Sequence, residues 1–141
     1  MLKGIDPVLN GALLKILDEM GHGDVLVLAD RNYPSYAGGA PVIDLGEIDT
    51  TRAARAILSV FPLDTFLERP LGRMEASNDP SMVLEPHREV LALADATWDG
   101  ELEYEVIPRF EFYRRARSAF AVVRTLDTRP YACFTLTKGV V

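Results

Sequence analysis

Two histidines, His22 and His87, are the side chains of this sequence best suited to moving protons near neutral pH. His22 lies between two glycines, and the backbone freedom of such a turn can aim an imidazole ring. His87 lies in the strongly polar stretch 85–89, a pattern that favours a solvated helix face. We therefore take His22 as the candidate acid/base group and leave His87 out of the predicted site. An exposed turn histidine without a catalytic role is the alternative for His22.

Two carboxylates flank the apolar run 25–29, Asp24 before it and Asp30 after it. A carboxylate close to His22 could orient the imidazole ring, which is the usual arrangement for an acid/base histidine. The sequence does not choose between the two aspartates for this role. A turn residue at Asp24 and a loop or helix cap at Asp30 are the structural alternatives.

Arg109 follows Pro108 at the junction of a predicted strand and a predicted helix. A guanidinium group there could bind neighbouring hydroxyl groups through its fork of N–H donors, and an exposed salt bridge is the alternative. The basic run 114–117 lies on the same predicted helix and is mixed with other residue types. This pattern favours a solvated or subunit-facing side of the helix over a phosphate site.

Several motifs that would indicate other chemistry are missing. The sequence has no glycine-rich phosphate loop, no His-Glu-x-x-His pair and no Gly-x-Ser-x-Gly motif. Its only cysteine, Cys133, cannot form an intrachain disulfide or a cysteine-rich metal site. We therefore expect no metal and no cofactor. Proton transfer and hydroxyl recognition remain as the chemistry that the chain could carry.

The elements that must position these residues follow an α/β pattern. Hydrophobic periodicity predicts helices over residues 9–20, 50–60, 82–94 and 109–119. Strands are predicted over 25–29, 42–45, 65–67, 103–107, 120–125 and 131–137, with 128–130 as the turn between the last two. An irregular stretch separates strand 65–67 from helix 82–94. Asp30 thus follows the carboxyl end of a buried strand, where open α/β sheets bind ligands.

Composition fits one domain over residues 1–141. The chain is 48% hydrophobic and 26% charged, and its length allows about 70% of the unfolded surface to be buried. A net charge of −6 argues against nucleic acid or an anionic membrane as the partner and favours a small neutral molecule. Pro7 interrupts the amino terminus before an apolar run of signal-peptide length, and no later run could span a bilayer. We therefore expect a cytoplasmic protein.

At the level of motifs, the sequence resembles the fucose mutarotase and ribose pyranase family over nearly its whole length. Each motif is short, but their order and spacing together are specific. The matching segments are Glu-Met-Gly-His-Gly-Asp at 19–24, Leu-Ala-Asp at 28–30, Asn-Tyr-Pro at 32–34, Phe-Pro-Leu-Asp at 61–64, Arg-Phe-Glu-Phe-Tyr at 109–113 and Lys-Gly-Val at 138–140.

The resemblance implies a role for particular residues of this chain. It implies that His22 is the catalytic acid/base and that Asp30 is its close catalytic partner in the sugar site. It also implies a set of substrate-binding residues that line the pocket. These are Asp30, Arg109, Tyr131, Ala132 and Cys133.

Two positions bear on the substrate. Arg109 favours the fucose branch, because ribose pyranases tend to carry a histidine there. Cys133 departs from the family pattern, which usually has asparagine, and a thiol is a weaker hydrogen-bonding group than an amide. The expected activity is the interconversion of the anomers and ring forms of a free monosaccharide, with L-fucose as substrate. A D-ribose pyranase, a non-catalytic monosaccharide-binding protein and an interaction protein that uses the basic helix are the alternatives.

The resemblance also implies a three-layer α/β/α domain with a central, mostly parallel sheet. It implies a ring-like homo-oligomer, such as a decamer, with sites at subunit interfaces. Aromatic residues in and after the last predicted helix agree with an oligomer larger than a dimer, because they offer more apolar surface than a small core needs. These are Phe110, Phe112, Tyr113 and Phe120. The expected partners are a monosaccharide and further copies of the chain.

Overall fold

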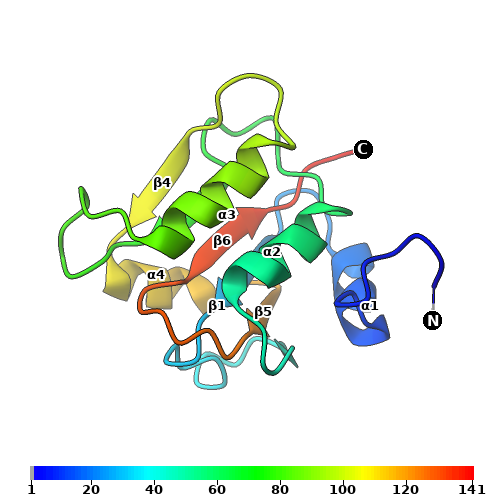
Figure 1. Ribbon diagram of the computed structural model, residues 1–141, viewed down its shortest axis with the longest axis horizontal. Helices are drawn as coiled ribbons and strands as arrows, with labels where there is room; N and C mark the ends of the chain where they lie inside the picture. Colours follow the sequence, from blue (N-terminus) through cyan, green and yellow to red (C-terminus); the bar gives the residue numbers. More distant parts are fainter. Residues whose placement is uncertain (1) are drawn as a thin grey trace.

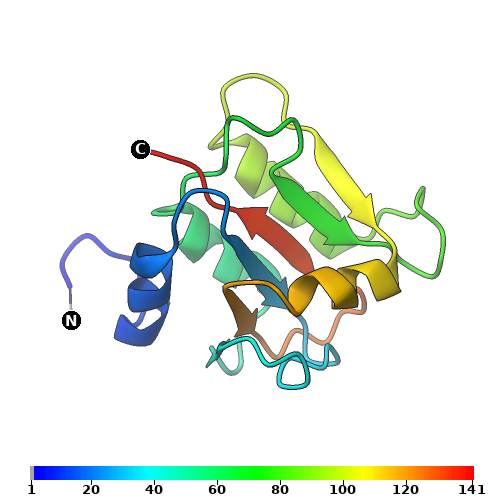
Figure 2. The same ribbon diagram turned by 180° about the vertical axis from the view of Figure 1, so that it is seen from behind.

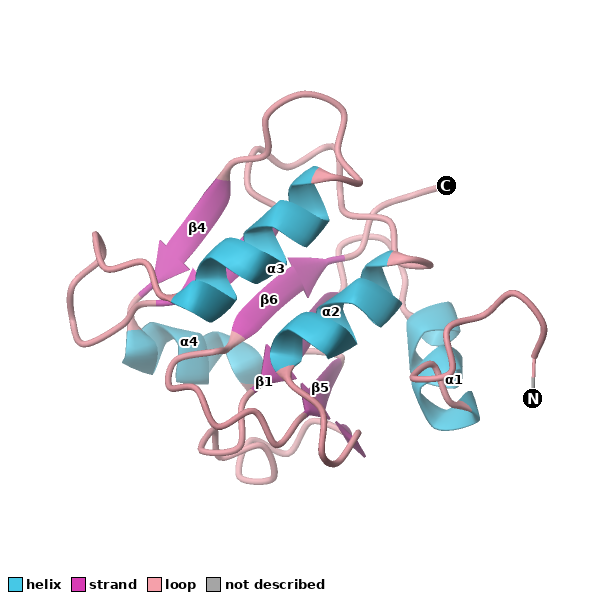
Figure 3. Cartoon of the chain, in the orientation of Figure 1, coloured by secondary structure: helices cyan, strands magenta, loops and turns pink. Residues whose placement is uncertain are grey.

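A computed structural model describes residues 2–141, which form a mixed α/β fold with a central six-stranded sheet (Figures 1 and 3). Four helices pack around this sheet. The helices are α1 (Gly11–Glu19), α2 (Thr50–Leu58), α3 (Glu85–Asp95) and α4 (Arg109–Ala116). The strands are β1 (Val25–Ala29), β2 (Val42–Asp44), β3 (Leu71–Met74), β4 (Tyr104–Ile107), β5 (Ala121–Arg124) and β6 (Phe134–Thr137).

The strand order across the sheet is β2-β5-β1-β6-β3-β4. Strand β6 is antiparallel to both of its neighbours, β1 and β3, whereas the other three pairings are parallel. Five strands therefore point the same way and β6 alone points the other way. The prediction of a mostly parallel sheet is confirmed.

The alternation of side chains along β1 explains why helices cover both faces of the sheet. Leu26 and Leu28 belong to the apolar cluster beneath α2 and α3. Val27 and Ala29 belong to a second cluster on the side of α4. A strand buried on both faces is a continuous apolar run, since each side chain enters one core or the other. Helices α2 and α3 cover the face turned to the viewer in Figure 1, and α4 covers the opposite face, seen in Figure 2.

Two predictions in the middle of the chain are wrong. Residues 65–67 form a turn rather than a strand, and β3 lies in the stretch expected to be irregular. The glycine of this strand is there because its neighbours approach closely. A Cβ atom on Gly72 would lie 2.5 Å from Thr135 Oγ1 and 2.6 Å from Ile107 Cδ1. Helix α3 also starts at Glu85 rather than at residue 82, because Pro86 fits the first turn of a helix.

The last two strands do not form the predicted hairpin, because β1 lies between β5 and β6. The segment between them therefore crosses the carboxyl end of β1. Asp127 in this segment is held by Thr50 at the start of α2, whose backbone N–H and hydroxyl donate to its Oδ2 at 2.9 and 2.8 Å. This crossing brings Tyr131 over the end of the strand that precedes Asp30.

None of the helices found in residues 2–141 has the length and apolar character needed to cross a membrane.

Candidate functional site

Asp30 is the first residue after β1 and its side chain is buried. Its Oδ1 accepts hydrogen bonds from the backbone N–H groups of Asn32 at 2.9 Å and Tyr33 at 3.0 Å. Its Oδ2 accepts one from the backbone N–H of Ala132 at 3.1 Å. Three backbone donors therefore fix the direction of this carboxylate. The alternative role of Asp30 as a loop cap is thus fulfilled in the structure and does not exclude ligand contact.

A pocket of about 200 Å³ opens beside this carboxylate. It lies where β1, β3, the start of α4 and the crossing segment meet. Its lining consists of Asp30, Asn32, Tyr33, Met74, Arg109, Tyr113, Pro130, Tyr131 and Cys133. Four of the five predicted substrate-binding residues thus line one pocket. The fifth, Ala132, lies behind it, fully buried, and contacts Asp30 through its backbone.

Three side chains around the pocket, those of Tyr33, Tyr113 and Cys133, keep their protons. Burial raises the pKa of the Tyr33 hydroxyl to about 12, and burial also raises the pKa of Tyr113. Burial, followed by the nearby Asp30 carboxylate, raises the pKa of the Cys133 thiol well above its usual range. Arg109 begins α4, and its guanidinium lies 4.6 Å from the centre of the Phe110 ring. The pocket therefore offers a carboxylate, a cation and neutral hydroxyl groups, which suits a polyhydroxylated neutral ligand.

His22 lies at the opposite end of β1, where its Nε2 is 3.1 Å from Oδ1 of Asp64. The imidazole is 46% exposed, whereas the Asp64 side chain is only 4% exposed. The backbone N–H of Phe66 also donates to the Asp64 carboxylate at 3.0 Å, and the Phe66 ring packs against the imidazole with 5.3 Å between ring centres. A buried, anchored carboxylate therefore orients a histidine that stays accessible.

Asp64 is a residue of the candidate site that sequence reasoning missed. The motif 61–64 was part of the family resemblance, but it gave no role to its aspartate. Asp24, by contrast, accepts a hydrogen bond from the backbone N–H of Gly21 at 2.7 Å and so stabilises the turn. Neither of the aspartates that flank β1 takes the place next to His22.

The segment after β6 positions both members of the His22–Asp64 pair. The backbone carbonyl of Lys138 accepts a hydrogen bond from Gly23 at 2.8 Å, and the N–H of Gly139 donates to Pro62 at 2.9 Å. A Cβ atom on Gly139 would lie 2.5 Å from the Leu63 carbonyl oxygen. The segment therefore runs tightly between the turn that carries His22 and the loop that carries Asp64, which gives the motif 138–140 a structural reason.

His22 and Asp30 do not meet within one chain. The five residues of β1 separate them, and at about 3.3 Å per residue such a strand is about 17 Å long. The expected close pairing of these two residues is therefore absent from the single chain. The predicted site residues therefore fall into two groups, His22 at one end of β1 and the residues around Asp30 at the other.

The prediction that His87 lies on a solvated helix face is wrong, because this residue is only 2% exposed. Its Nδ1 accepts a hydrogen bond from the backbone N–H of Leu84 at 3.1 Å, and its Nε2 lies 2.9 Å from the carbonyl oxygen of Tyr131. Burial lowers the pKa of His87, so the ring is neutral at neutral pH. His87 is the third residue of α3, and its ring faces inward, where it reaches both of these partners.

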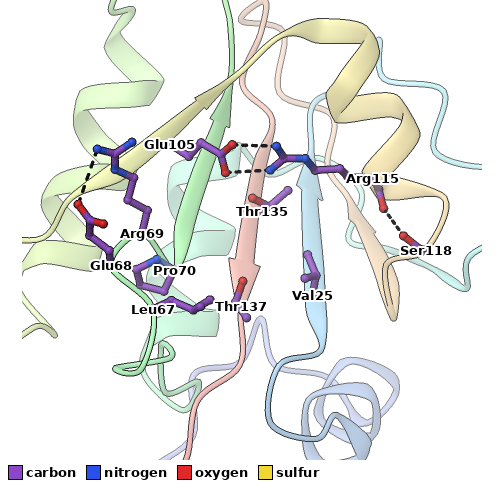
Figure 4. A pocket seen from close by; sticks show the side chains of 10 residues that line it. All are labelled: Val25, Leu67, Glu68, Arg69, Pro70, Glu105, Arg115, Ser118, Thr135 and Thr137. Atoms are coloured by element: carbon purple, nitrogen blue, oxygen red, sulfur yellow. Dashed lines mark hydrogen bonds and ion pairs between the residues drawn. The ribbon is translucent and has the colours of Figure 1, made fainter.

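A second cavity, of about 580 Å³, contains none of the predicted site residues (Figure 4). Arg115 projects into it and makes a bidentate ion pair with Glu105, with both N–O distances at 2.8 Å. Arg115 and Arg114 also pair with Glu111. Neighbouring carboxylates thus neutralise Arg114 and Arg115, two of the three arginines of the basic run, which argues against a phosphate site there. Residues 2–141 also contain no group of three or more histidine, cysteine or acidic side chains that could hold a metal ion.

Comparison with known proteins identifies similar chains over the full length. The model of the RbsD / FucU transport protein family matches residues 3–141. An L-fucose mutarotase of Glaesserella parasuis is 41% identical over 141 residues, which cover 99% of this chain and 96% of the relative. The fucose mutarotase of Streptococcus pneumoniae, solved in complex with L-fucose, is 33% identical to this chain. Its structure superposes with a TM-score of 0.91 over 99% of both chains.

Bacillus subtilis RbsD, solved in complex with D-ribose, is 28% identical to this chain. Its structure superposes with a TM-score of 0.74 over 100% of this chain and 99% of the RbsD chain. The resemblance recognised in the motifs is thus confirmed over the whole sequence and the whole fold. This chain belongs to the RbsD / FucU transport protein family.

Proposed function

We propose that this chain is a mutarotase that interconverts the anomers of L-fucose. The observation that carries the proposal is the pocket at the carboxyl end of β1, where Asp30, Arg109 and Tyr131 present hydroxyl-binding groups around a small cavity. The relatives named as fucose mutarotases support the choice of sugar, since they are more similar to this chain than the D-ribose-bound RbsD. Arg109 also favours the fucose branch of the family.

The chemistry requires only proton transfer. A base removes the proton of the anomeric hydroxyl while an acid protonates the ring oxygen, so that the C1–O5 bond breaks and an open aldehyde forms. Rotation about the C1–C2 bond followed by the reverse proton transfers closes the ring on the other face. No covalent enzyme intermediate is needed. Positioned acid/base groups contribute about 10²- to 10⁴-fold to such a step.

The roles follow from the surroundings of each residue. His22 moves the proton, because it is an accessible imidazole held by a buried carboxylate. Asp30 and Arg109 hold sugar hydroxyls, one as an acceptor and the other as a donor. Tyr131 closes the pocket from the crossing segment.

Because His22 and the pocket lie at opposite ends of β1 within a single chain, we propose that the complete site forms between two copies in a ring-like homo-oligomer. The exposed aromatic rings support this arrangement. Phe66 next to His22 is 74% exposed, and Phe110 next to Arg109 is 71% exposed. Phe112, which was expected to add to this surface, is instead fully buried in the core beneath α4. The apolar surface that a partner would cover thus lies beside both half-sites.

Exchange NMR tests the proposed activity. The rate of α–β interconversion is measured for L-fucose, D-ribose and D-galactose with the parent chain and with Asp30→Asn. We expect the parent to accelerate the exchange of L-fucose most, and the variant to lose this acceleration. A larger acceleration of D-ribose would make the chain a ribose pyranase. Saturation transfer from the protein to L-fucose without accelerated exchange would make it a non-catalytic sugar-binding protein.

A further inference from the structure

His87 connects the start of α3 with the segment that closes the pocket. Its Nδ1 accepts the hydrogen bond of the Leu84 N–H, so the ring proton of the neutral imidazole resides on Nε2. This Nε2–H donates to the carbonyl oxygen of Tyr131 at 2.9 Å. The imidazole ring also packs edge-on against Phe134, with 6.0 Å between ring centres. Both ring nitrogens and one ring edge are therefore committed to fixed partners.

The acceptor of this bond belongs to the same peptide group that holds Asp30. The peptide between Tyr131 and Ala132 receives the His87 N–H at its carbonyl oxygen and donates its own N–H to Oδ2 of Asp30. Hydrogen bonds at the two ends of one peptide group polarise it in the same direction and strengthen each other. The peptide is thus clamped between a buried imidazole and the carboxylate that faces the pocket.

The backbone of Tyr131 requires such a clamp. Its φ angle is +58°, in the left-handed region that residues other than glycine rarely adopt. This conformation directs the carbonyl of Tyr131 towards α3 and its side chain towards the pocket. A conformation of this kind persists when the surrounding structure holds it in place.

We propose that His87 is a positioning residue of the sugar pocket, which fixes the Tyr131–Ala132 peptide and through it the Tyr131 side chain and the Asp30 carboxylate. The part of this inference that concerns sugar rests on the proposed function. His87 touches neither the pocket nor the His22–Asp64 pair. Its effect is therefore on sugar binding and not on proton transfer.

A role as a mere cap of α3 is the competing explanation, because Leu84 has no side-chain acceptor for the orphan N–H groups of the helix. Two substitutions separate the two roles. In His87→Asn the amide can occupy the place of Nδ1 and accept from Leu84, but it is too short to reach Tyr131. In His87→Gln the amide can reach the place of Nε2 and donate to the Tyr131 carbonyl. Val90→Ala serves as the matched control, since it removes buried volume from the same helix without touching either hydrogen bond.

We expect His87→Asn to raise the KM for L-fucose about tenfold while kcat stays within about threefold of the parent. His87→Gln should bring the KM back to within about threefold, and Val90→Ala should leave it within about twofold at a temperature where the variant is folded. An unchanged KM in folded His87→Asn would overturn the inference. An equal rise of the KM in Val90→Ala would also overturn it, because the effect would then come from the helix as a whole.

Amide hydrogen exchange without sugar tests the clamp independently of catalysis. In the parent, we expect the Ala132 amide to exchange as slowly as the amides of the adjoining β6. In His87→Asn its exchange should accelerate about tenfold, with no such change in Val90→Ala. An Ala132 amide that exchanges as fast as exposed loop amides in the parent would contradict the clamp even if His87→Asn did not fold. If the parent did not catalyse the exchange of L-fucose, the proposed function would fail, and this measurement would still decide the role of His87.

Discussion

The contact between His22 and Asp64 combines two properties that an acid/base histidine needs. Burial of Asp64 and its hydrogen bond from the Phe66 N–H give the carboxylate one fixed direction. Exposure of nearly half of the imidazole leaves the other side of the ring open to an approaching ligand. The pair can therefore orient one ring nitrogen while the other remains available to a sugar hydroxyl.

We predict that His22→Gln keeps the affinity for L-fucose within a few-fold and reduces anomer exchange by about 10²-fold or more. A glutamine side chain can form hydrogen bonds but cannot take up and release a proton. Exchange NMR and a binding titration measure the two effects separately. Lys15→Gln is the control, because Lys15 forms only an exposed ion pair with Glu19 on α1. Exchange by His22→Gln at the rate of this control would remove His22 from the mechanism.

Cys133 lines the pocket and is nevertheless shielded from solvent, with 1% of its surface exposed. We predict that Cys133→Asn changes the ratio of L-fucose to D-ribose exchange by about fivefold or more, since the amide gains a sugar hydroxyl as its partner. The urea midpoint should change little. Cys133→Ala, which removes the thiol and adds no amide, should leave the ratio near that of the parent. A large loss in the midpoint with an unchanged ratio would show that position 133 belongs to the core alone.

At the scale of elements, a network of ion pairs fixes the segment that crosses β1. Asp127 binds the start of α2 through Thr50, and Arg129 donates to Asp127 and to Glu89 of α3, both at 2.8 Å. Burial alone would raise the pKa of Asp127, but hydrogen bonds from Arg129 and Thr50 outweigh it and lower the pKa to about 2. The segment that carries Tyr131 is thus tied to two helices.

Acid should weaken this tie. The folded-state pKa of Asp127 lies below the ordinary value of 3.8, so its contribution is complete above about pH 4 and is lost as the pH falls towards 2. We predict a loss of about 1–2 kcal/mol in the free energy of unfolding over this range. Urea midpoints between pH 6 and pH 2.5 should fall less steeply for Asp127→Asn than for the parent. Parallel curves for the two proteins would show that Asp127 does not titrate in this range.

Strand β1 and helix α2 could be predicted from the sequence, because their apolar patterns are local. Strand β3 could not, since Gly72 serves a close approach of neighbouring strands, and a glycine two residues after a proline otherwise predicts a loop. The hairpin expected between β5 and β6 was wrong because β1, which is far away in the sequence, lies between them. The pattern of a short stretch of sequence does not show which distant segment will lie beside it in the fold.

The same distinction holds for the candidate site. Asp30 was predictable, because the end of a buried strand defines its place. The pairing of His22 with Asp64 and the burial of His87 were not predictable, because each depends on a partner far along the chain. A polar stretch of sequence indicates that most of its side chains are exposed, but it does not show which single side chain is buried. Here the inward-facing imidazole of His87 finds two hydrogen-bond partners, which makes its burial favourable.

At the scale of the whole molecule, His22 and the pocket lie at opposite ends of β1, and in the proposed function a second copy of the chain brings them together. We predict an oligomer larger than a dimer, because each chain offers two different surfaces, one around Phe66 and one around Phe110. A contact between unlike surfaces adds copies head to tail, and these form a ring when the rotation between neighbours closes. Light scattering at micromolar concentration measures the mass. A monomer would count against both the ring and the shared site.

The most direct test of this account is complementation between two inactive variants. His22→Gln chains keep the pocket, and Asp30→Asn chains keep the histidine, so that each variant alone should lack exchange of L-fucose. When the two are co-expressed and purified as mixed oligomers, about one quarter of the interfaces should combine an intact His22 with an intact Asp30. We therefore predict recovery of about one quarter of the parent's exchange rate per chain. Exchange no faster than that of the two variants measured separately would contradict a site shared between copies.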